Sequence, residues 1–563
     1  MPCTGGQVSG DVEGRSVNAE RHDRGSRRPA VFDQPAGTRP TEAAPVRRPV
    51  PVREPEAEEF TSILGGVPDA RVDAPEFFVD LNLDQIVQSV TAGRDEYDLR
   101  PFFHVSLHDT DAVRFRQEVF RDLEDEGVLR HVVAFAERMR TMREQLRTAG
   151  KLRYRYQKER LFLDAASTYC EAAGSLLGDL SDTKLRSRGF KALRRFLEGL
   201  VRSRTFVALR EEIASLSADL SAVRYCMHIK GGRISVRKAA TEIDYTAEVE
   251  KTFEKFRRGA VESHLCDIPD YLEMNHIEAA VLEMVARLYP ETFGALDAFF
   301  ENHQEFADPK VTGFDREVQF YLAWLAYTDR FRRAGLAFCY PEVSPYEKAI
   351  RCVEGFDLAL AGRLLTDKAP VVRNDFHLEG PERIFVVTGP NQGGKTTFAR
   401  MFGQLHYLAG LGCPIPGRAA TLFLFDRLFT HFEKEEDVAN LRGKLEDDLI
   451  RVHRVLQEAS PRSIVIMNEI FTSTTLHDAL FLGRKVMESI IRLDLIAVCV
   501  TFVDELASLG EKTVSLTSMV DPDNPARRTF KIIRRPADGR SHAMAIARLH
   551  GLAYADLKKR LKP

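Results

Sequence analysis

The chain has 563 residues, too many for one compact core, so we expect roughly two to four domains. Its 80 lysines and arginines against 83 aspartates and glutamates give a formal net charge of -3, which excludes a uniformly basic nucleic-acid binder and leaves only a local basic surface. The eight cysteines form no C-x-x-C pair, and no apolar run reaches the length of about eighteen residues that a membrane span needs. We therefore expect a cytoplasmic protein with no zinc ribbon and no membrane partner.

Residues 1–74 are expected to form a disordered tail. Arg, Pro, Gly and Ala dominate this stretch, and aliphatic periodicity is almost absent. Such a composition cannot bury enough apolar surface to offset its ordering entropy. Its clustered arginines suit either contact with nucleic acid or simple solubility, and composition favours the second.

Residues 75–340 are predicted to form a mostly α-helical domain. Segments such as VLRHVVAFAERMRTMREQL repeat apolar residues at helical spacing. One interruption, near 224–238, alternates apolar and polar residues on both sides of a Gly-Gly pair and predicts a β-hairpin. The hairpin either contacts DNA phosphates or only braces two helices, and both interpretations stay open. The cations for the first are Arg224, Lys230, Arg233, Arg237 and Lys238.

Residues 341–563 are predicted to form an α/β P-loop ATPase domain. Short β-rich runs alternate with helical patterns here, as in IFVV, TLFLFDRLF, SIVIM and LIAVCVTF. The stretch IFVVTGPNQGGKTTFARMF fits the spacing G-x-x-x-x-G-K-[ST] between a strand and a helix. Its glycines let backbone amides face phosphate oxygens, and the following helix offers its positive end to the same anion.

This phosphate loop predicts a bound ATP. We expect Lys395 to hold the β- and γ-phosphates and the Thr396 hydroxyl to hold Mg²⁺. The expected nucleotide-binding residues of the loop are Gly389, Pro390, Asn391, Gln392, Gly393, Gly394, Lys395, Thr396 and Thr397.

A second strand pattern supplies the expected catalytic group. SIVIMNE places four apolar residues before Asn468 and Glu469. We expect the Asn468 side-chain oxygen to reach Mg²⁺ and Glu469 to polarise the attacking water as a general base. Asparagine lacks the full charge of the aspartate that is usual here, so weaker metal binding or slower turnover is expected.

Together, these motifs resemble the MutS family of ABC-type ATPases from about Phe77 onward. TGPNQGGKTTFAR is similar to that family's phosphate loop, NEIFTSTTLHDA to its Walker B segment, GRSHAMAIARLHGL to its closing helix, and DTDAVRFRQEVFRDLED to the start of its lever domain. The resemblance implies a homodimer in which a signature segment of one subunit, here with Gly443 and Lys444, completes the nucleotide site of the other. It also implies ATP-dependent recognition of double-stranded DNA, by its structure or its mismatches, in repair or recombination.

The chain departs from the family pattern at several places. The serine usual near Gly443 is missing, and Phe502 stands where the family has a histidine, so slow hydrolysis is expected. Nothing before Phe77 is expected to fold into the mismatch-recognition domain, and the Phe-x-Glu spacings at Phe135 and Phe196 fall inside helical patterns. Two alternatives therefore stay open: an ATPase switch that acts on a protein or ribonucleoprotein, and a nucleotide-binding protein with little hydrolysis.

Overall fold

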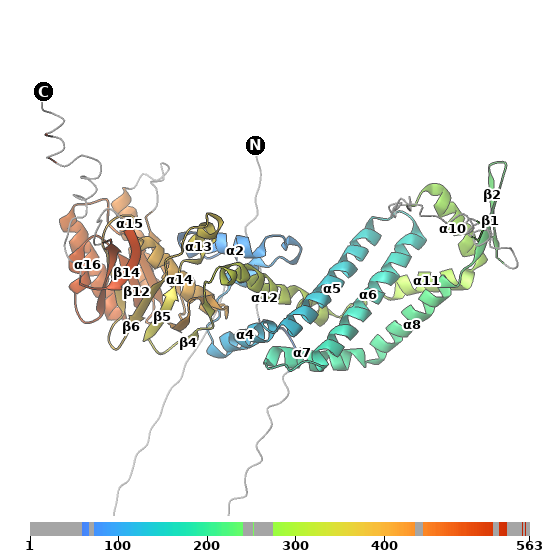
Figure 1. Ribbon diagram of the computed structural model, residues 1–563, viewed down its shortest axis with the longest axis horizontal. Coiled ribbons are helices and arrows are strands. Elements are labelled where there is room, and N and C mark those ends of the chain that lie inside the picture. Colours follow the sequence, from blue (N-terminus) through green and yellow to red (C-terminus); the bar gives the residue numbers. More distant parts are fainter. Residues whose placement is uncertain are drawn as a thin grey trace, which may run out of the picture. The chain divides into compact units, whose positions relative to one another are not determined.

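The computed structural model describes residues 59–66, 73–239, 251–252, 274–433, 443–521 and 528–536, together with Tyr554 and Lys558. Within these residues, helices and one hairpin make up the region before residue 337, and sheets flanked by helices make up the region after it (Figure 1). No described helix is long and apolar enough to cross a membrane.

Part of the predicted tail packs against the helical region. Phe60, Ile63 and Leu64 are buried, and the Tyr321 hydroxyl donates to the Ile63 carbonyl at 2.8 Å. The expectation of a disordered tail as far as residue 74 is therefore wrong for 59–66. Three large apolar side chains in FTSIL drive this packing, and the Arg- and Pro-rich composition of the longer stretch masked them. The rest of residues 1–72 lies outside the described part.

Apolar faces hold the helical region together. Asp125 accepts hydrogen bonds from two backbone amides at the start of α5, and Asn275 forms a capping box with Glu278 at the start of α10. Helices α5 and α6 lie side by side (Figure 1). Helices α1 to α8 span Phe77–Asp80, Leu83–Thr91, Arg100–His104, Thr110–Leu123, Glu126–Lys151, Arg155–Ser181, Arg188–Val201 and Arg204–Ser221, and α10 to α12 span His276–Leu288, Pro290–Asn302 and Pro309–Arg333.

Both Phe-x-Glu spacings belong to this packing. Phe135 is fully buried on α5, and the ring of Phe196 stacks on Phe60 with 5.7 Å between centroids. Neither ring is available to stack on a base. The hairpin expected near 224–238 is present as β1 Tyr225–Lys230 and β2 Arg233–Lys238, which pair antiparallel.

A six-stranded sheet lies at the centre of the region after residue 337, in the order β10-β11-β12-β7-β13-β14. Its first five strands are parallel, and β14 is antiparallel to β13. Nearly continuous buried runs of Val and Ile suit strands that are covered on both faces. The strands are β7 Ile384–Thr388, β10 Leu428–Phe432, β11 Ile464–Asn468, β12 Ile496–Val500, β13 Thr513–Val520 and β14 Arg528–Arg534.

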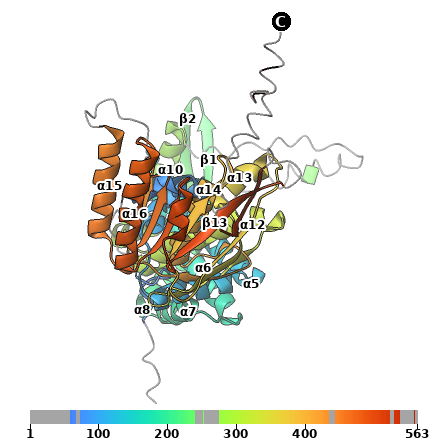
Figure 2. The same cartoon turned by 90° about the vertical axis from the view of Figure 1, so that its left-hand side faces the viewer.

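Alternate residues of β7 face two different apolar cores. Phe385 and Val387 pack with α14 Lys395–Gly410, whereas Ile384 and Val386 pack with α15 Lys444–Glu458 and α16 Leu476–Leu493. Figure 2 shows α15 and α16 together on one side of the sheet. The phosphate loop thus leaves the middle of a sheet that is covered by helices on both faces.

A second, four-stranded sheet has the order β4-β9-β5-β6. The run TLFLFDRLF, expected as one strand, is divided between β9 in this sheet and β10 in the larger one. Asp426 lies between the two strands and accepts hydrogen bonds from two serine hydroxyls near the start of β11, which fixes the turn. The remaining elements are β3 Phe338–Cys339, β4 Glu342–Ser344, β5 Ile350–Gly355, α13 Leu358–Thr366, β6 Asn374–Leu378, β8 Ile415–Pro416 and β9 Ala419–Phe423, with the short 3₁₀ helices Asp95–Tyr97 and Asp504–Ser508.

The C-terminal end of α14 is bonded to the helical region. The Leu107 amide donates to the Gly410 carbonyl at 2.8 Å. Arg116, only 1% exposed, donates to the carbonyls of Leu411 at 3.1 Å and Leu64 at 3.0 Å. The helix that follows the phosphate loop is therefore fixed at its far end by the region that precedes the ATPase sheet.

Candidate nucleotide site

A cavity of about 530 Å³ lies over the phosphate loop. Its lining brings together most of the residues expected at the nucleotide, namely Asn391, Gln392, Gly393, Gly394, Lys395, Thr396, Thr397 and Glu469. A larger cavity of about 1030 Å³ lies in the helical region, lined by residues such as Leu322 and Arg332, and contains none of the motif residues. The residues of the nucleotide-binding motifs therefore meet at the smaller cavity.

The loop backbone depends on glycine. Gly389 and Gly394 have φ values of +116° and +93°, which side chains rarely permit. A Cβ atom at Gly393 would lie 2.2 Å from the Ser518 hydroxyl, and that hydroxyl donates to the Gly393 carbonyl at 2.6 Å. The end of β13 thus presses against the loop and determines its path.

The Lys395 ammonium is turned into this loop. The side chain is 4% exposed, and its Nζ donates to the carbonyls of Gly389 at 3.1 Å and Pro390 at 3.2 Å and to the Asn391 side chain at 3.4 Å. Burial lowers the pKa of Lys395, and the Glu469 carboxylate, 3.9 Å from Nζ, opposes that shift. The ammonium is therefore held at the loop by weak neutral acceptors that phosphate oxygens can replace.

Asn468 is the last residue of β11, and Glu469 follows it. The Thr396 hydroxyl donates to the Asn468 side-chain oxygen at 2.9 Å, so the two expected magnesium ligands already meet. Glu469 has a φ of +56°, and its amide donates to the Val500 carbonyl at 2.9 Å. This turn of the backbone directs Glu469 to the cavity lining, whereas Asn468 stays buried beside Thr396.

The oxygen ligands fit a magnesium ion. Hydroxyl and amide oxygens from Thr396 and Asn468, completed by phosphate oxygens and water, match the ligands that Mg²⁺ takes in nucleotide sites. The described residues contain no cluster of three or more His, Cys, Asp or Glu side chains that could hold another metal.

Sequence reasoning missed Phe530. This residue lines the cavity, is 47% exposed and has a φ of +57°. Asn374 holds it there, because its amide donates to the Phe530 carbonyl at 3.3 Å and its oxygen accepts from the Ile532 amide at 2.8 Å. Leu360, Leu364, Val371 and Val372 complete an apolar wall beside it. The only signal in the sequence was an aromatic residue in a strand pattern.

Gly443 and Lys444 are not part of this cavity. Gly443 precedes α15 and is exposed, and the Lys444 ammonium pairs with Glu433 of the same chain. Glu433 also accepts from the Thr472 hydroxyl at 3.3 Å, which links the start of α15 to the segment after Glu469. Phe502, at the end of β12, is 48% exposed and does not line the cavity.

The five cations of the hairpin do not share one face. Residues opposite one another in an antiparallel pair lie on the same face. Lys230 is opposite Arg233, and Arg237 is opposite Cys226, so these three cations share a face, whereas Lys238 belongs to the other. All five side chains are exposed.

Two of the five cations are engaged at the base of the hairpin. The Arg224 guanidinium donates to the Ser221 carbonyl at 2.7 Å, and the Lys238 ammonium lies 4.6 Å from the centre of the Tyr289 ring. The Tyr289 hydroxyl in turn donates to the Arg224 carbonyl at 2.5 Å. Arg224 and Lys238 thus brace the hairpin, whereas the phosphate-contact interpretation of Lys230, Arg233 and Arg237 stays a prediction.

Residues 385–558 match the family model described as MutS domain V. The C-terminal part of the chain is therefore similar to MutS proteins. The DNA mismatch repair protein MutS of Erythrobacter litoralis (strain HTCC2594) is 29% identical over 226 residues, which make up 39% of this chain and 26% of that protein. DNA mismatch repair protein MutS of Orientia tsutsugamushi (strain Boryong) is 28% identical over 222 residues, 38% of this chain and 24% of that protein. The matched part spans about a quarter of the length of these relatives.

The MutS match begins within β7 and includes the phosphate loop, β11 and β12. The resemblance inferred from the motifs is thereby confirmed for this part. The region before residue 385 lies outside the match. This region includes the hairpin and the segment DTDAVRFRQEVFRDLED, which is similar to the start of a lever domain.

Proposed function

We propose that the chain is an ATP-dependent DNA-binding protein of the MutS type, which acts as a homodimer and hydrolyses ATP slowly. The observation that carries the ATPase proposal is the meeting of Thr396 and Asn468 at 2.9 Å, with Glu469 and Lys395 at the same cavity. The MutS domain V match supports the link to DNA.

Each residue of the site has a distinct task in this proposal. Lys395 exchanges the loop carbonyls for phosphate oxygens, and Thr396 and Asn468 hold the magnesium ion. Bound Mg²⁺ neutralises the charge that develops on the phosphates. Glu469 orients and polarises the attacking water, and Phe530 with the apolar wall receives the nucleobase.

The dimer supplies the remaining contacts. Gly443 and Lys444 lie outside their own cavity, at the N-terminus of α15, and in the dimer they would contact the nucleotide of a second copy. That role requires Lys444 to exchange Glu433 for the γ-phosphate of the partner's nucleotide. ATP would then stabilise one arrangement of the two subunits around DNA.

One mobility-shift series tests this function. Homoduplex, mismatched duplex, branched duplex and single-stranded RNA are compared with the purified chain, with and without ATP and Mg²⁺. We expect binding to duplex DNA that changes with ATP and falls steeply with salt. Binding that ignores both ATP and salt would refute the proposal.

The near-neutral charge also favours a second candidate, an ATPase switch on a protein or ribonucleoprotein partner. Nuclease treatment of material copurified from cells separates the two. Association with one protein that survives nuclease supports the switch, and release of the bound material by DNase supports the DNA-binding function.

A further inference from the structure

Helix α7 and its flanks carry an exposed group of cations that neither the nucleotide site nor the hairpin uses. Residues 184–204 contain eight cations and a single carboxylate, Glu198, in a chain whose formal net charge is -3. We refer to the exposed cations of this segment as the cationic stripe. They are Lys184, Arg186, Lys191, Arg195, Arg202 and Arg204.

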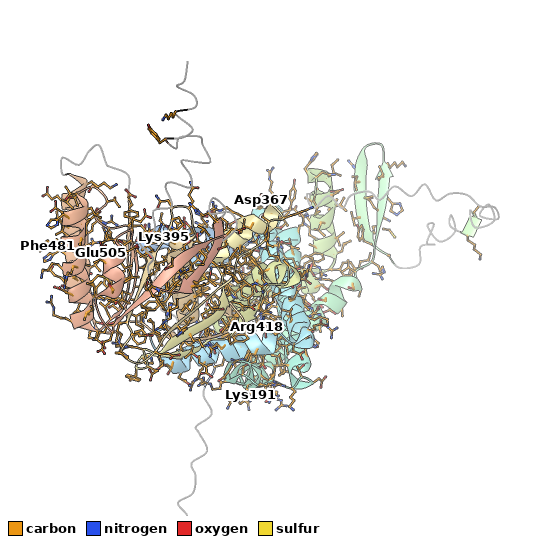
Figure 3. The ribbon with its side chains drawn as sticks, turned by 60° about the vertical axis from the view of Figure 1, so that its left-hand side comes forward. Lys191, Asp367, Lys395, Arg418, Phe481 and Glu505 are labelled. Atoms are coloured by element: carbon orange, nitrogen blue, oxygen red, sulfur yellow. The ribbon has the colours of Figure 1, made fainter. Side chains whose placement is uncertain are left out.

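The amphipathic sequence of α7 exposes the two central members of the stripe. Phe190, Leu193 and Leu197 are buried against the neighbouring helices, so the opposite face is left to solvent. Lys191 and Arg195 are four residues apart on that face. Figure 3 shows Lys191 at the lower edge of the helical region.

The structure leaves the stripe without neutralising carboxylates. The Lys191 ammonium donates to the Arg186 carbonyl at 2.8 Å, and Arg195 donates to the Lys191 carbonyl at 3.4 Å. Neighbouring Arg188, by contrast, pairs with Asp111 and Glu118. Within the described part of the chain, no member of the stripe has a carboxylate within ion-pair distance. The stripe therefore presents uncompensated positive charge.

The chemistry of the stripe favours a phosphate backbone over a peptide. Protein interfaces depend on buried aromatic or aliphatic anchors, yet none of the exposed large hydrophobic residues of the described chain lies between residues 184 and 210. Four of the six cations are arginines, whose planar guanidinium groups bind phosphate oxygens in pairs. Binding to the phosphate backbone of a nucleic acid needs only such cations, because this binding is driven by the release of counterions.

We propose that the cationic stripe binds the sugar-phosphate backbone of duplex DNA, as a contact separate from the hairpin. This inference rests on the proposed function, since it assumes that the chain binds DNA. The 14 residues of α7 extend about 21 Å, which corresponds to about six base pairs of duplex. Contact with this backbone adds affinity without sequence preference.

The test compares two double variants of the full chain. Lys191→Glu with Arg195→Glu reverses the centre of the stripe, and Arg130→Glu with Arg351→Glu makes the same change of net charge at exposed cations elsewhere. We expect the stripe variant to bind duplex DNA on the order of tenfold more weakly at low salt, and the slope of log K against log salt to fall by about 2. The control should lose no more than about twofold. ATP affinity should stay unchanged in both, which shows that the fold is intact.

Each other outcome is decisive. Equal DNA binding by the stripe variant and the parent, or an equal loss in the control, overturns the stripe and leaves the proposed function standing. Unchanged DNA binding together with lost binding to polyglutamate assigns the stripe to an acidic peptide and also overturns the inference. DNA binding that depends on the stripe but does not change with ATP overturns the ATP dependence in the proposed function and leaves the stripe standing, and no DNA binding by the parent refutes both.

Discussion

Asn468 and Glu469 are adjacent in sequence but have different surroundings. Asn468 keeps the strand conformation and accepts from Thr396 at 2.9 Å, whereas the positive φ of Glu469 turns its side chain to the cavity. A left-handed residue other than glycine is costly and persists where the surroundings fix it. Here the bond from the Glu469 amide to Val500 does so.

Glu469→Gln should slow phosphate release while leaving ATP binding intact. The amide keeps the shape of the carboxylate but cannot accept a proton from water, so we expect a loss of about 100-fold or more in turnover with nucleotide affinity within about threefold. Malachite green assays and fluorescent-nucleotide titration measure the two quantities. Glu505→Gln, at an exposed glutamate away from the cavity (Figure 3), serves as the control. Equal turnover in all three proteins would remove Glu469 from its role.

The phosphate loop could be predicted because its chemistry is local: glycines, a lysine and a threonine at fixed spacing between a strand and a helix. Phe530 could not, because its position depends on Asn374, more than 150 residues earlier in the chain. The division of the hairpin cations likewise follows from strand register and from Tyr289. The sequence shows where the cationic side chains are, but it does not show which of them already contact other groups of the same chain.

At the scale of elements, Asp494 joins several strands at the end of the sheet away from the phosphate loop. It has a left-handed backbone after α16, and its carboxylate binds Lys512 at 2.7 Å, Lys348 at 3.0 Å and Arg383 at 3.1 Å. Burial raises the pKa of Asp494, but the bonds from Lys512 and Lys348 outweigh it and lower the pKa to about 2. The folded state therefore favours the ionised form.

Asp494→Asn should destabilise the protein in a pH-dependent way. A carboxyl whose folded pKa is depressed stabilises the fold above its unfolded pKa, near 3.8, and loses that contribution as pH falls toward 2. The side chain is 38% exposed, so solvent screening limits the loss to about 1 kcal/mol at pH 7. Urea unfolding of the variant and the parent at pH 7 and near pH 2 measures it.

A matched variant makes the result specific. Asp367→Asn, at an exposed aspartate after α13 (Figure 3), removes the same charge without an ion pair and should change stability by less than about 0.5 kcal/mol. A difference between Asp494→Asn and the parent that stays constant across pH would contradict the electrostatic explanation.

In the ATPase sheet, strand prediction succeeded for the buried central strands and failed at one turn. Strands β7, β11 and β12 correspond to the predicted runs IFVV, SIVIM and the core of LIAVCVTF. These runs could be recognised because a strand that is covered on both faces has an uninterrupted apolar sequence. The segment TLFLFDRLF is apolar on both sides of Asp426, so the sequence reads as one strand. Only the strand pairing in the structure shows that β9 and β10 belong to different sheets.

At the scale of the whole molecule, Arg116 connects segments far apart in sequence. Its guanidinium satisfies carbonyls at Leu64 and Leu411, and its burial lowers its pKa. The sequence predicted a mostly helical region here but not this contact, because an arginine is usually exposed and nothing in the sequence marks this one as buried.

Arg116→Met should lower the free energy of unfolding by about 2 kcal/mol, because two buried carbonyls lose their donor. Chemical denaturation compared with Arg130→Met, a change at an exposed arginine on α5, isolates the effect. A midpoint at or above that of the parent would show instead that the cost of burying the charge exceeds the value of its bonds.

Helix α14 has 16 residues and no break between Lys395 and Gly410, so it behaves as a rod about 24 Å long. Its two ends cannot be displaced independently along its axis. A ligand that draws Lys395 and Thr396 forward therefore pulls on the Gly410 carbonyl and, through the Leu107 amide, on the segment leading into α4. In the proposed function, a shift of the phosphate loop on binding or hydrolysis of the triphosphate would be transmitted along this helix as strain on the hydrogen bond between Leu107 and Gly410.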